Sequence, residues 1–184
     1  FSANNDPYDS KGLIQKHDNR YVVQNRPQLP LSQHELDRVY GLDYTRKVHP
    51  FCLSQGYVKG IDTVRFSITS HRGCYGGCSF CAITLHQGRI IQSRSISSIL
   101  REAEQISKDE KFNGYISDIG GPTANMYGHD CLKKVELGSC KEKQCIGDEV
   151  CHTLNPSHKA YIDLLSQVEK LPFIKKVFIS SGIR

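Results

Sequence analysis

The sequence lacks the features of several large protein classes. No apolar run approaches the roughly 18 residues that a membrane span needs, and no signal-like apolar segment precedes the cysteines. It also has no G-x4-G-K-[ST] phosphate loop, no G-x-S-x-G nucleophile turn and no H-E-x-x-H zinc motif. Its 24 Lys and Arg residues only modestly outnumber 19 Asp and Glu residues, and they are dispersed without alternating aromatic residues. We therefore expect a cytoplasmic protein with a mildly basic, solvated surface, histidines mostly at that surface, and no membrane or nucleic-acid partner.

Cysteine, by contrast, is plentiful, and three of the eight cysteines share one short loop. Cys74, Cys78 and Cys81 follow C-x3-C-x2-C spacing in HRGCYGGCSFCAIT, directly after a strand-like run. Three thiolates from one loop can hold three irons of a [4Fe–4S] cube and leave the fourth iron open for chemistry. Zinc is the alternative, although it usually needs a second pair of ligands at finger or ribbon spacing. A disulfide is disfavoured because one cysteine would remain over and such short spacings strain the bridge.

A second cysteine group lies in a charged segment with little apolar periodicity, which we interpret as an insert at residues 128–155. Its members are Cys131, Cys140, Cys145 and Cys151. Four soft ligands in a segment too polar to build its own core favour a second metal site, either an iron–sulfur cluster or a zinc ion. Their spacing matches no common zinc-finger signature, so free buried thiols or redox-sensitive pairs are the alternatives. Cys52 lies outside both groups and is interpreted as an ordinary thiol.

Hydrophobic periodicity predicts alternating strands and helices in the second two thirds of the chain. The expected strands cover residues 64–69, 115–119 and 177–179, and the expected helices begin after Ser95 or Ser97 and after Asn155-Pro156. This order implies parallel strands joined by right-handed crossovers. The turns that end the three strands are the cysteine loop, Gly-Gly-Pro and Ser-Ser-Gly, and we expect all three on one rim.

Residues 1–60 are predicted to form a largely irregular segment that leads into this region. The first 20 residues are polar and charged and are expected to be a loop, and residues 21–23 form at most a short strand. Ser32 and Glu35 have the spacing of a capping box, which predicts a short helix after Ser32.

The surroundings of the cysteine loop resemble the radical S-adenosylmethionine (SAM) enzymes, and within them the YgiQ family. The resemblance is carried by RFSITSHRGCYGGCSFCAITLHQGRIIQSRS, GYISDIGGPTANMYG and ISSGIR, and it runs from about Val22 to Arg184. It implies an α/β fold in which residues 61–184 form the first half of a partial (β/α) barrel. Because the chain starts without Met and contains too few strands for the whole barrel, we expect a fragment of a longer protein.

This resemblance implies a reaction. SAM would bind the open iron through its amino and carboxylate groups. One electron from a donor such as flavodoxin or ferredoxin would then cleave SAM to a 5′-deoxyadenosyl radical, which abstracts hydrogen from an unknown substrate. The fragment alone is expected to be inactive. The alternative is a non-enzymatic iron–sulfur or zinc module that serves stability or redox sensing.

The resemblance also implies cofactor contacts. Phe80 would lie beside the adenine, with a core aromatic as the alternative. Gly120 and Gly121 would bring bare backbone close to the methionine amino group, with an ordinary tight turn as the alternative. Ser181 would contact the ribose. Pro122 stands where the superfamily commonly has Glu, so this turn offers no side-chain carboxylate.

Overall fold

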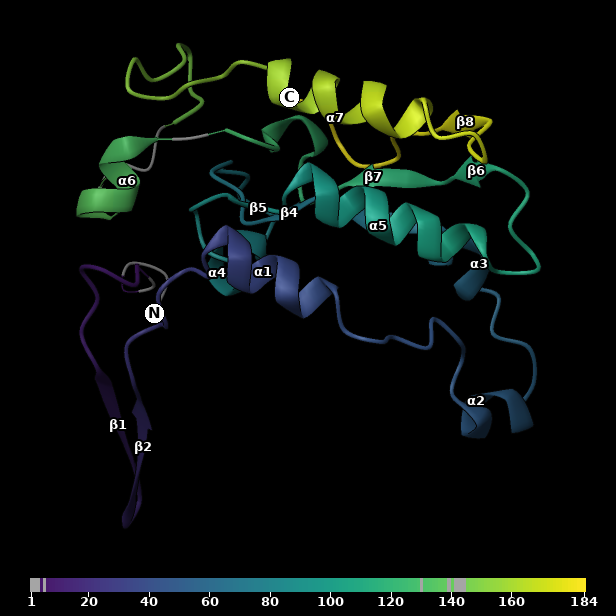
Figure 1. Ribbon diagram of the computed structural model, residues 1–184. Coiled ribbons are helices and arrows are strands. Elements are labelled where there is room, and N and C mark those ends of the chain that lie inside the picture. The colour runs from purple at the N-terminus through teal and green to yellow at the C-terminus, as the bar shows by residue number, and fades with distance from the viewer. Residues whose placement is uncertain (1–3, 5, 130, 139, 141–144) are drawn as a thin grey trace.

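The computed structural model describes residues 4, 6–129, 131–138, 140 and 145–184 (Figure 1). Its strands are β1 (Leu13–His17), β2 (Arg20–Gln24), β3 (Ser67–Thr69), β4 (His71–Arg72), β5 (Gln92–Ser93), β6 (Tyr115–Ile116), β7 (Asp118–Gly120) and β8 (Lys176–Val177). Its helices are α1 (Gln33–Tyr40), α2 (Pro50–Ser54), α3 (Ile61–Val64), α4 (Ile83–His86), α5 (Ile96–Ser107), the 3-10 helix η2 (Ala124–Met126), α6 (Leu132–Leu137) and α7 (Lys159–Glu169). The fold is mixed α/β, and the described strands form two-stranded sheets without closing a barrel.

The main hydrophobic core lies where α5 and α7 cover the paired strands (Figure 1). It includes Ile68 of β3, Ile99 and Ile106 of α5, Ile119 of β7 and Leu164 of α7, all at most 2% exposed. Strand β3 pairs with β7 and β6 pairs with β8, both in parallel. The predicted parallel pairing of these strands is therefore confirmed.

Both long helices form where their apolar stripes predict them. The hydroxyl of Ser95 accepts a hydrogen bond from the backbone N–H of Ser98 at 3.1 Å, so Ser95 caps α5. The buried side of α7 carries Tyr161, Leu164 and Val168, spaced three or four residues apart as one helix face requires. Local pattern and tertiary packing agree in these two elements.

The strand predicted over residues 64–69 is wrong at its first half. Residues Ile61–Val64 form the short helix α3, closed by a backbone bond from Arg65 to the carbonyl of Ile61 at 2.8 Å. Val64 is 57% exposed, and β3 covers only Ser67–Thr69. The alternation of Val64, Phe66 and Ile68 is too short to distinguish a strand from a helical turn.

The strand predicted over residues 115–119 is also not continuous. Its first part, β6, pairs with β8, while its second part, β7, pairs with β3. Between them Ser117 donates its backbone N–H to the carbonyl of Phe66 at 3.0 Å. The chain thus changes neighbours at Ser117, a shift in hydrogen bonding that the apolar pattern does not record.

The last predicted strand is shorter and less buried than expected. Strand β8 ends at Val177, and Phe178 and Ile179 are 43% and 39% exposed. Among the described residues β8 has a strand partner on one side, β6, which leaves its other edge and these side chains uncovered.

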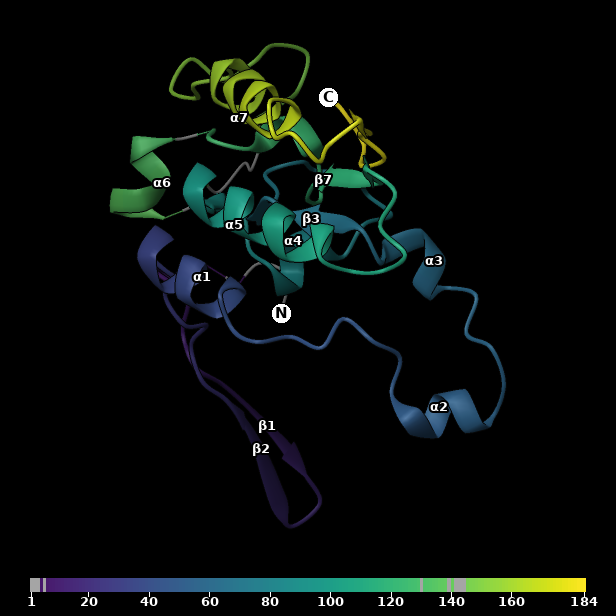
Figure 2. The same cartoon turned by 45° about the vertical axis from the view of Figure 1, so that its right-hand side comes forward.

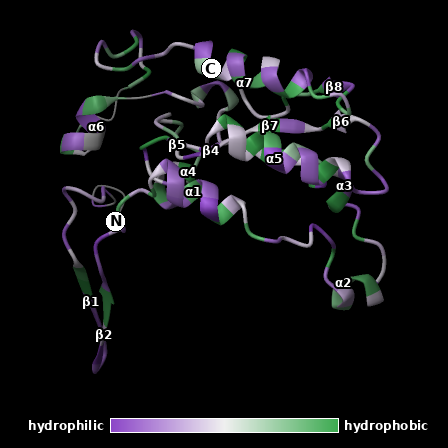
Figure 3. Ribbon diagram, in the orientation of Figure 1, coloured by the Kyte–Doolittle hydropathy of each residue, from purple (hydrophilic) through white to green (hydrophobic). Residues whose placement is uncertain are grey.

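The lead-in is more regular than predicted. Strands β1 and β2 form an antiparallel hairpin with His17 opposite Arg20, and the hairpin projects away from the core (Figures 1 and 2). Its apolar residues appear as green segments on the outside of the molecule in Figure 3, and Ile14 and Val23 are 70% and 59% exposed. The capping box of Ser32 and Glu35 at the start of α1 is confirmed. No helix in the described part of the chain is long and apolar enough to cross a bilayer.

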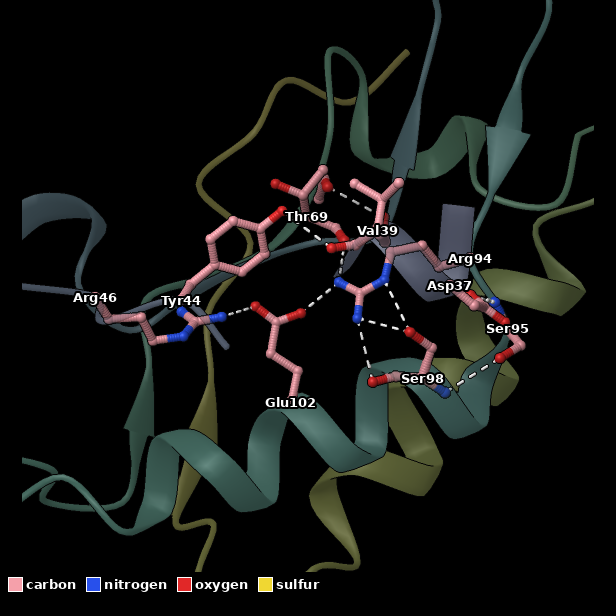
Figure 4. A network of polar contacts seen from close by, with 11 residues as sticks. Asp37, Val39, Tyr44, Arg46, Thr69, Arg94, Ser95, Ser98 and Glu102 are labelled. Carbon is pink, nitrogen blue, oxygen red and sulfur yellow. Dashed lines mark hydrogen bonds and ion pairs between the residues drawn. The ribbon is translucent and has the colours of Figure 1, made fainter. Parts of the chain in front are cut away.

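A buried arginine joins the lead-in to the core (Figure 4). Arg94 is fully buried and donates to the carbonyl of Thr69 at 2.8 Å and to the hydroxyl of Ser98 at 2.9 Å. Its guanidinium pairs with the Glu102 carboxylate, which also binds Arg46 of the lead-in. The ring of Tyr40 at the end of α1 lies 4.3 Å from the Arg94 guanidinium carbon. The network satisfies a charge that would otherwise be costly to bury.

Candidate functional site

Contacts between the three rim turns confirm that they lie together. Ser70, just before the cysteine loop, donates its backbone N–H to the carbonyl of Gly120 at 2.7 Å. The Cys74 thiol lies 3.7 Å from the Thr123 hydroxyl, just beyond the Gly-Gly-Pro turn. Arg184, beyond the Ser-Ser-Gly turn, places its guanidinium against the sulfur of Cys78.

Backbone geometry holds the cysteine loop in a tight path. Gly73 has φ of +85°, and a Cβ at this position would lie 2.0 Å from the carbonyl oxygen of Ile90, so only glycine fits. The buried Arg89 guanidinium donates to the carbonyls of Tyr75 at 2.7 Å and Gly76 at 3.2 Å. One cation thus fixes the loop between the first and second cysteines.

The side chains of the three loop cysteines are not gathered around one point in the structure. Cys74 is 7% exposed, while Cys78 and Cys81 are half-buried. In the part of the chain that the structure describes, no group of three or more His, Cys, Asp or Glu side chains is arranged to hold a metal ion. The iron–sulfur assignment of these cysteines therefore stays a prediction.

The chemistry around the sulfurs fits an iron–sulfur cluster. The backbone N–H of Gly76 points to the sulfur of Cys74 at 3.4 Å, and the Arg184 cation contacts the sulfur of Cys78. Cysteine sulfurs are the usual ligands of such clusters, and N–H donors to the sulfurs are a common part of their surroundings. Three soft ligands in this setting fit the cluster, although their positions would have to close around it.

A cavity of about 340 Å³ lies beside the loop, and Gly120, Gly121 and Ser181 line it together with His71. A Cβ on Gly121 would lie 2.7 Å from Cε1 of His71, and one on Gly120 would lie 2.2 Å from Oγ of Ser181. Both positions require glycine because neighbouring side chains already fill the space. The structure thus places three of the predicted cofactor-binding residues on one cavity.

Asp118 positions the third turn, and sequence reasoning missed it. Its carboxylate accepts backbone N–H groups from Ser180 at 2.9 Å and Ser181 at 3.2 Å, and it also accepts the Ser181 hydroxyl. The available signal was a carboxylate in a short apolar strand, two residues before Gly120. Such a residue needs hydrogen-bond donors from another segment.

Phe80 is 89% exposed, so the core-aromatic alternative is wrong in this structure. The structure does not bring Phe80 to the lining of the 340 Å³ cavity. A contact between its ring and an adenine stays a prediction.

The second cysteine group is partly assembled. The sulfurs of Cys131 and Cys151 both face the Thr153 hydroxyl, at 3.7 and 3.2 Å. Hydrogen bonds from Thr153 lower the pKa of the Cys151 thiol. Cys151 also donates its backbone N–H to the carbonyl of Cys145 at 3.1 Å. Cys140 is half-buried, but residues 139 and 141–144 beside it lie outside the described residues.

The insert has more apolar packing than its composition predicts. Cys145 and Leu154 are 6% and 8% exposed and pack against Tyr75 and Met126. The insert therefore gains its order by docking on the cysteine loop, which explains why its own sequence shows no core pattern.

Two histidines near the loop are buried, contrary to the expected surface placement. His71 is 1% exposed and its Nδ1 lies 2.9 Å from the Ser70 hydroxyl. His129 is 6% exposed, with Nδ1 bonded to the Tyr75 hydroxyl, and its ring stacks on that of His158 at 5.7 Å. Burial lowers the pKa of both histidines, that of His71 to about 4, so both rings are neutral at pH 7.

Because of His71, we expect stability to fall in mild acid. Its unfolded pKa is 6.5 and its folded pKa is about 4, so the unfolded chain binds more protons between these pH values. The free energy of unfolding should therefore decrease as pH falls from about 6.5 to about 4, by about 3 kcal/mol in total. Urea denaturation across this range should show a shallower pH slope in His71→Asn, whereas the exposed His34→Asn should keep the original slope. An equal slope in both variants would contradict the assignment.

Comparisons with known proteins relate the chain to one group. Residues 1–67 match the family described as Radical SAM N-terminal. The chain is 49% identical over 184 residues to a UPF0313 protein of Fusobacterium nucleatum, covering 100% of this chain and 32% of that protein. It is 54% identical over 179 residues to a UPF0313 protein of Clostridium botulinum, covering 97% of this chain and 28% of that protein. The chain thus spans about a third of the length of these relatives, and together the matches support a radical SAM-related family for it.

Proposed function

We propose that this chain is the part of a YgiQ-type radical SAM enzyme that holds the cluster and SAM. Cys74, Cys78 and Cys81 would hold a [4Fe–4S] cluster, and the 340 Å³ cavity lined by Gly120 and Gly121 would receive SAM. The observation that carries the proposal is this adjacency of a three-cysteine loop and a cavity with bare glycine backbone. Residues 61–184 would form the first half of the barrel and residues 1–60 its lead-in. Because the cytoplasm keeps thiols reduced, a protein with free cysteine ligands would be located there.

The chain's own residues have distinct tasks in this proposal. The Gly76 N–H and the Arg184 guanidinium would donate hydrogen bonds to the sulfurs of Cys74 and Cys78. The carbonyl of the buried Gly120 already accepts two hydrogen bonds from Ser70, so the carbonyl of the half-buried Gly121 would be the acceptor for an ammonium group. The Ser181 hydroxyl, oriented by Asp118, would offer a partner to a ribose. When bound, the cluster and SAM would together supply a 5′-deoxyadenosyl radical for hydrogen abstraction. A small electron-transfer protein would serve as the electron donor.

The test is SAM cleavage by the full-length protein that contains this chain. After anaerobic reconstitution with iron and sulfide and reduction by dithionite, we expect release of 5′-deoxyadenosine, measured by liquid chromatography. Gly121→Val should abolish release, because its Cβ would lie 2.7 Å from the His71 ring and 2.8 Å from the His71 carbonyl oxygen and would displace this wall of the cavity. Unchanged iron content in this variant would show that the cysteine loop is intact. A matched change outside the cavity, Gly147→Val, meets no atom within 4 Å and should leave release unchanged. A reconstituted wild-type protein that forms no 5′-deoxyadenosine would favour the non-enzymatic module.

We also propose that Cys131, Cys140, Cys145 and Cys151 bind a second metal, as zinc or an iron–sulfur cluster. The proposal is supported by the approach of Cys131 and Cys151 to the same Thr153 hydroxyl and by the lowered pKa of Cys151. Metal bound there would fasten the insert to the core that it already contacts through Cys145.

A further inference from the structure

A second, larger cavity lies between the lead-in and the segment that follows the cysteine loop. Its volume is about 640 Å³, within the range of small-molecule binding sites, which often form between domains. One wall comes from the lead-in and includes Leu29, Leu31 and Tyr44, which are 62%, 41% and 55% exposed. The opposite wall is mostly polar: it includes Arg72, His86 and the buried Arg89, which donates to loop carbonyls, together with the apolar Leu85 and Ile90. The cleft therefore combines an apolar and aromatic wall with a polar, cationic one.

This cleft adjoins the cavity proposed for SAM. Tyr40, Arg72 and Gln87 line both of them. Tyr40 is held by its stacking on the buried Arg94, and Gln87 accepts the backbone N–H of Gly73 at 3.2 Å. These three side chains therefore form the boundary between the cleft and the cofactor cavity, and the contacts of Tyr40 and Gln87 hold two of them in place.

Arg72 is the third of these side chains, and it lines the cleft as well as the cofactor cavity. It follows the buried His71 in β4 and is itself half-buried. Among the described residues nothing forms a hydrogen bond or ion pair with the Arg72 guanidinium, whereas Arg65 and Arg94 each bind a carboxylate. Asp6 also lines the cleft, but its Oδ1 accepts the backbone N–H of Tyr8 at 2.9 Å. Arg72 therefore brings a cation to the cleft whose guanidinium donors have no partner among the described residues.

We propose that the 640 Å³ cleft is the substrate site and that Arg72 binds a carboxylate or phosphate of the substrate. The substrate class is a small molecule with an apolar or aromatic body, which lies on the lead-in wall, and one anionic group, which pairs with the guanidinium. Its reacting carbon would lie toward the shared residues and the cofactor cavity. The reaction rests on the proposed function, but the binding of such a molecule does not require the cluster.

The test uses two fluorescent probes of similar shape with the full-length protein. The anionic probe is 8-anilinonaphthalene-1-sulfonate and the neutral one is N-phenyl-1-naphthylamine. We expect Arg72→Gln to weaken binding of the anionic probe about tenfold or more, because hydrogen bonds between charged groups are stronger than those between neutral groups. The neutral probe should bind this variant as it binds the wild type, which also shows that the variant is folded. Arg72→Lys should recover part of the loss.

Two control variants make the outcome decisive. Arg20→Gln removes an exposed arginine on the projecting hairpin and should leave both probes unaffected. Cys78→Ala should also leave both probes unaffected, because the cleft does not include the cysteine loop. Equal affinity of the anionic probe for wild type and Arg72→Gln, or equal weakening of both probes, would overturn the proposal. Failure of SAM cleavage with intact probe selectivity would instead count against the proposed reaction alone.

Discussion

Replacing Cys78 with alanine should abolish the iron–sulfur cluster of the cysteine loop. The reconstituted wild type should carry about four irons at this loop and absorb broadly in the visible range. Two remaining thiolates do not hold the cube, so Cys78→Ala should lose those irons and that absorbance. Iron and sulfide analysis after anaerobic reconstitution measures the change. Cys52→Ala removes an exposed thiol outside both cysteine groups and should keep full iron content.

The insert cysteines give the complementary result. Changing Cys140 and Cys145 together to serine should remove the second metal, whether zinc or iron, and keep the loop cluster. It should also raise protease sensitivity between residues 128 and 155, because the insert would lose the metal that holds it in place.

Unchanged iron in Cys78→Ala would refute the assignment of the loop cysteines as cluster ligands. Unchanged total metal in the double variant would show that the insert cysteines are not ligands.

Replacing Arg94 with methionine should cause the largest loss of stability, about 3–5 kcal/mol in the free energy of unfolding. Methionine fills similar space but leaves the Glu102 carboxylate, 6% exposed, with Arg46 as its remaining cation. The carbonyl of Thr69 and the hydroxyl of Ser98 would lose their donors as well. Urea denaturation monitored by circular dichroism measures the difference from wild type.

Two comparisons separate the network from the mere loss of a charge. Arg101→Met changes an exposed arginine on the same helix as Glu102 and should cost less than about 0.5 kcal/mol. Arg94→Met combined with Glu102→Leu should recover much of the loss, because the uncompensated buried carboxylate is then gone. Equal losses in Arg94→Met and Arg101→Met would show that the buried network does not hold the lead-in to the core.

Local chemistry determined the parts of this protein that the sequence predicts well. A capping box needs only Ser32 and Glu35, three residues apart, and the stripe of α5 needs only its own 12 residues. The spacing of Cys74, Cys78 and Cys81 likewise lies within one loop, and it indicates the cluster chemistry without knowledge of the fold. These signals are short-range, so one segment carries each of them completely.

The tertiary structure decided what depends on segments far apart in the chain. In the sequence Arg94 has no feature that distinguishes it from a surface arginine. In the structure it is the centre of a buried network with Glu102, Arg46 and Thr69. The partner change at Ser117 depends on which strands lie beside it, and an apolar pattern contains no such information. Arg72 likewise becomes a candidate ligand-binding residue only because the fold brings it and residues of the lead-in to one cleft. Burial and charge pairing are properties of a position in space, and the sequence fixes them only through the complete fold.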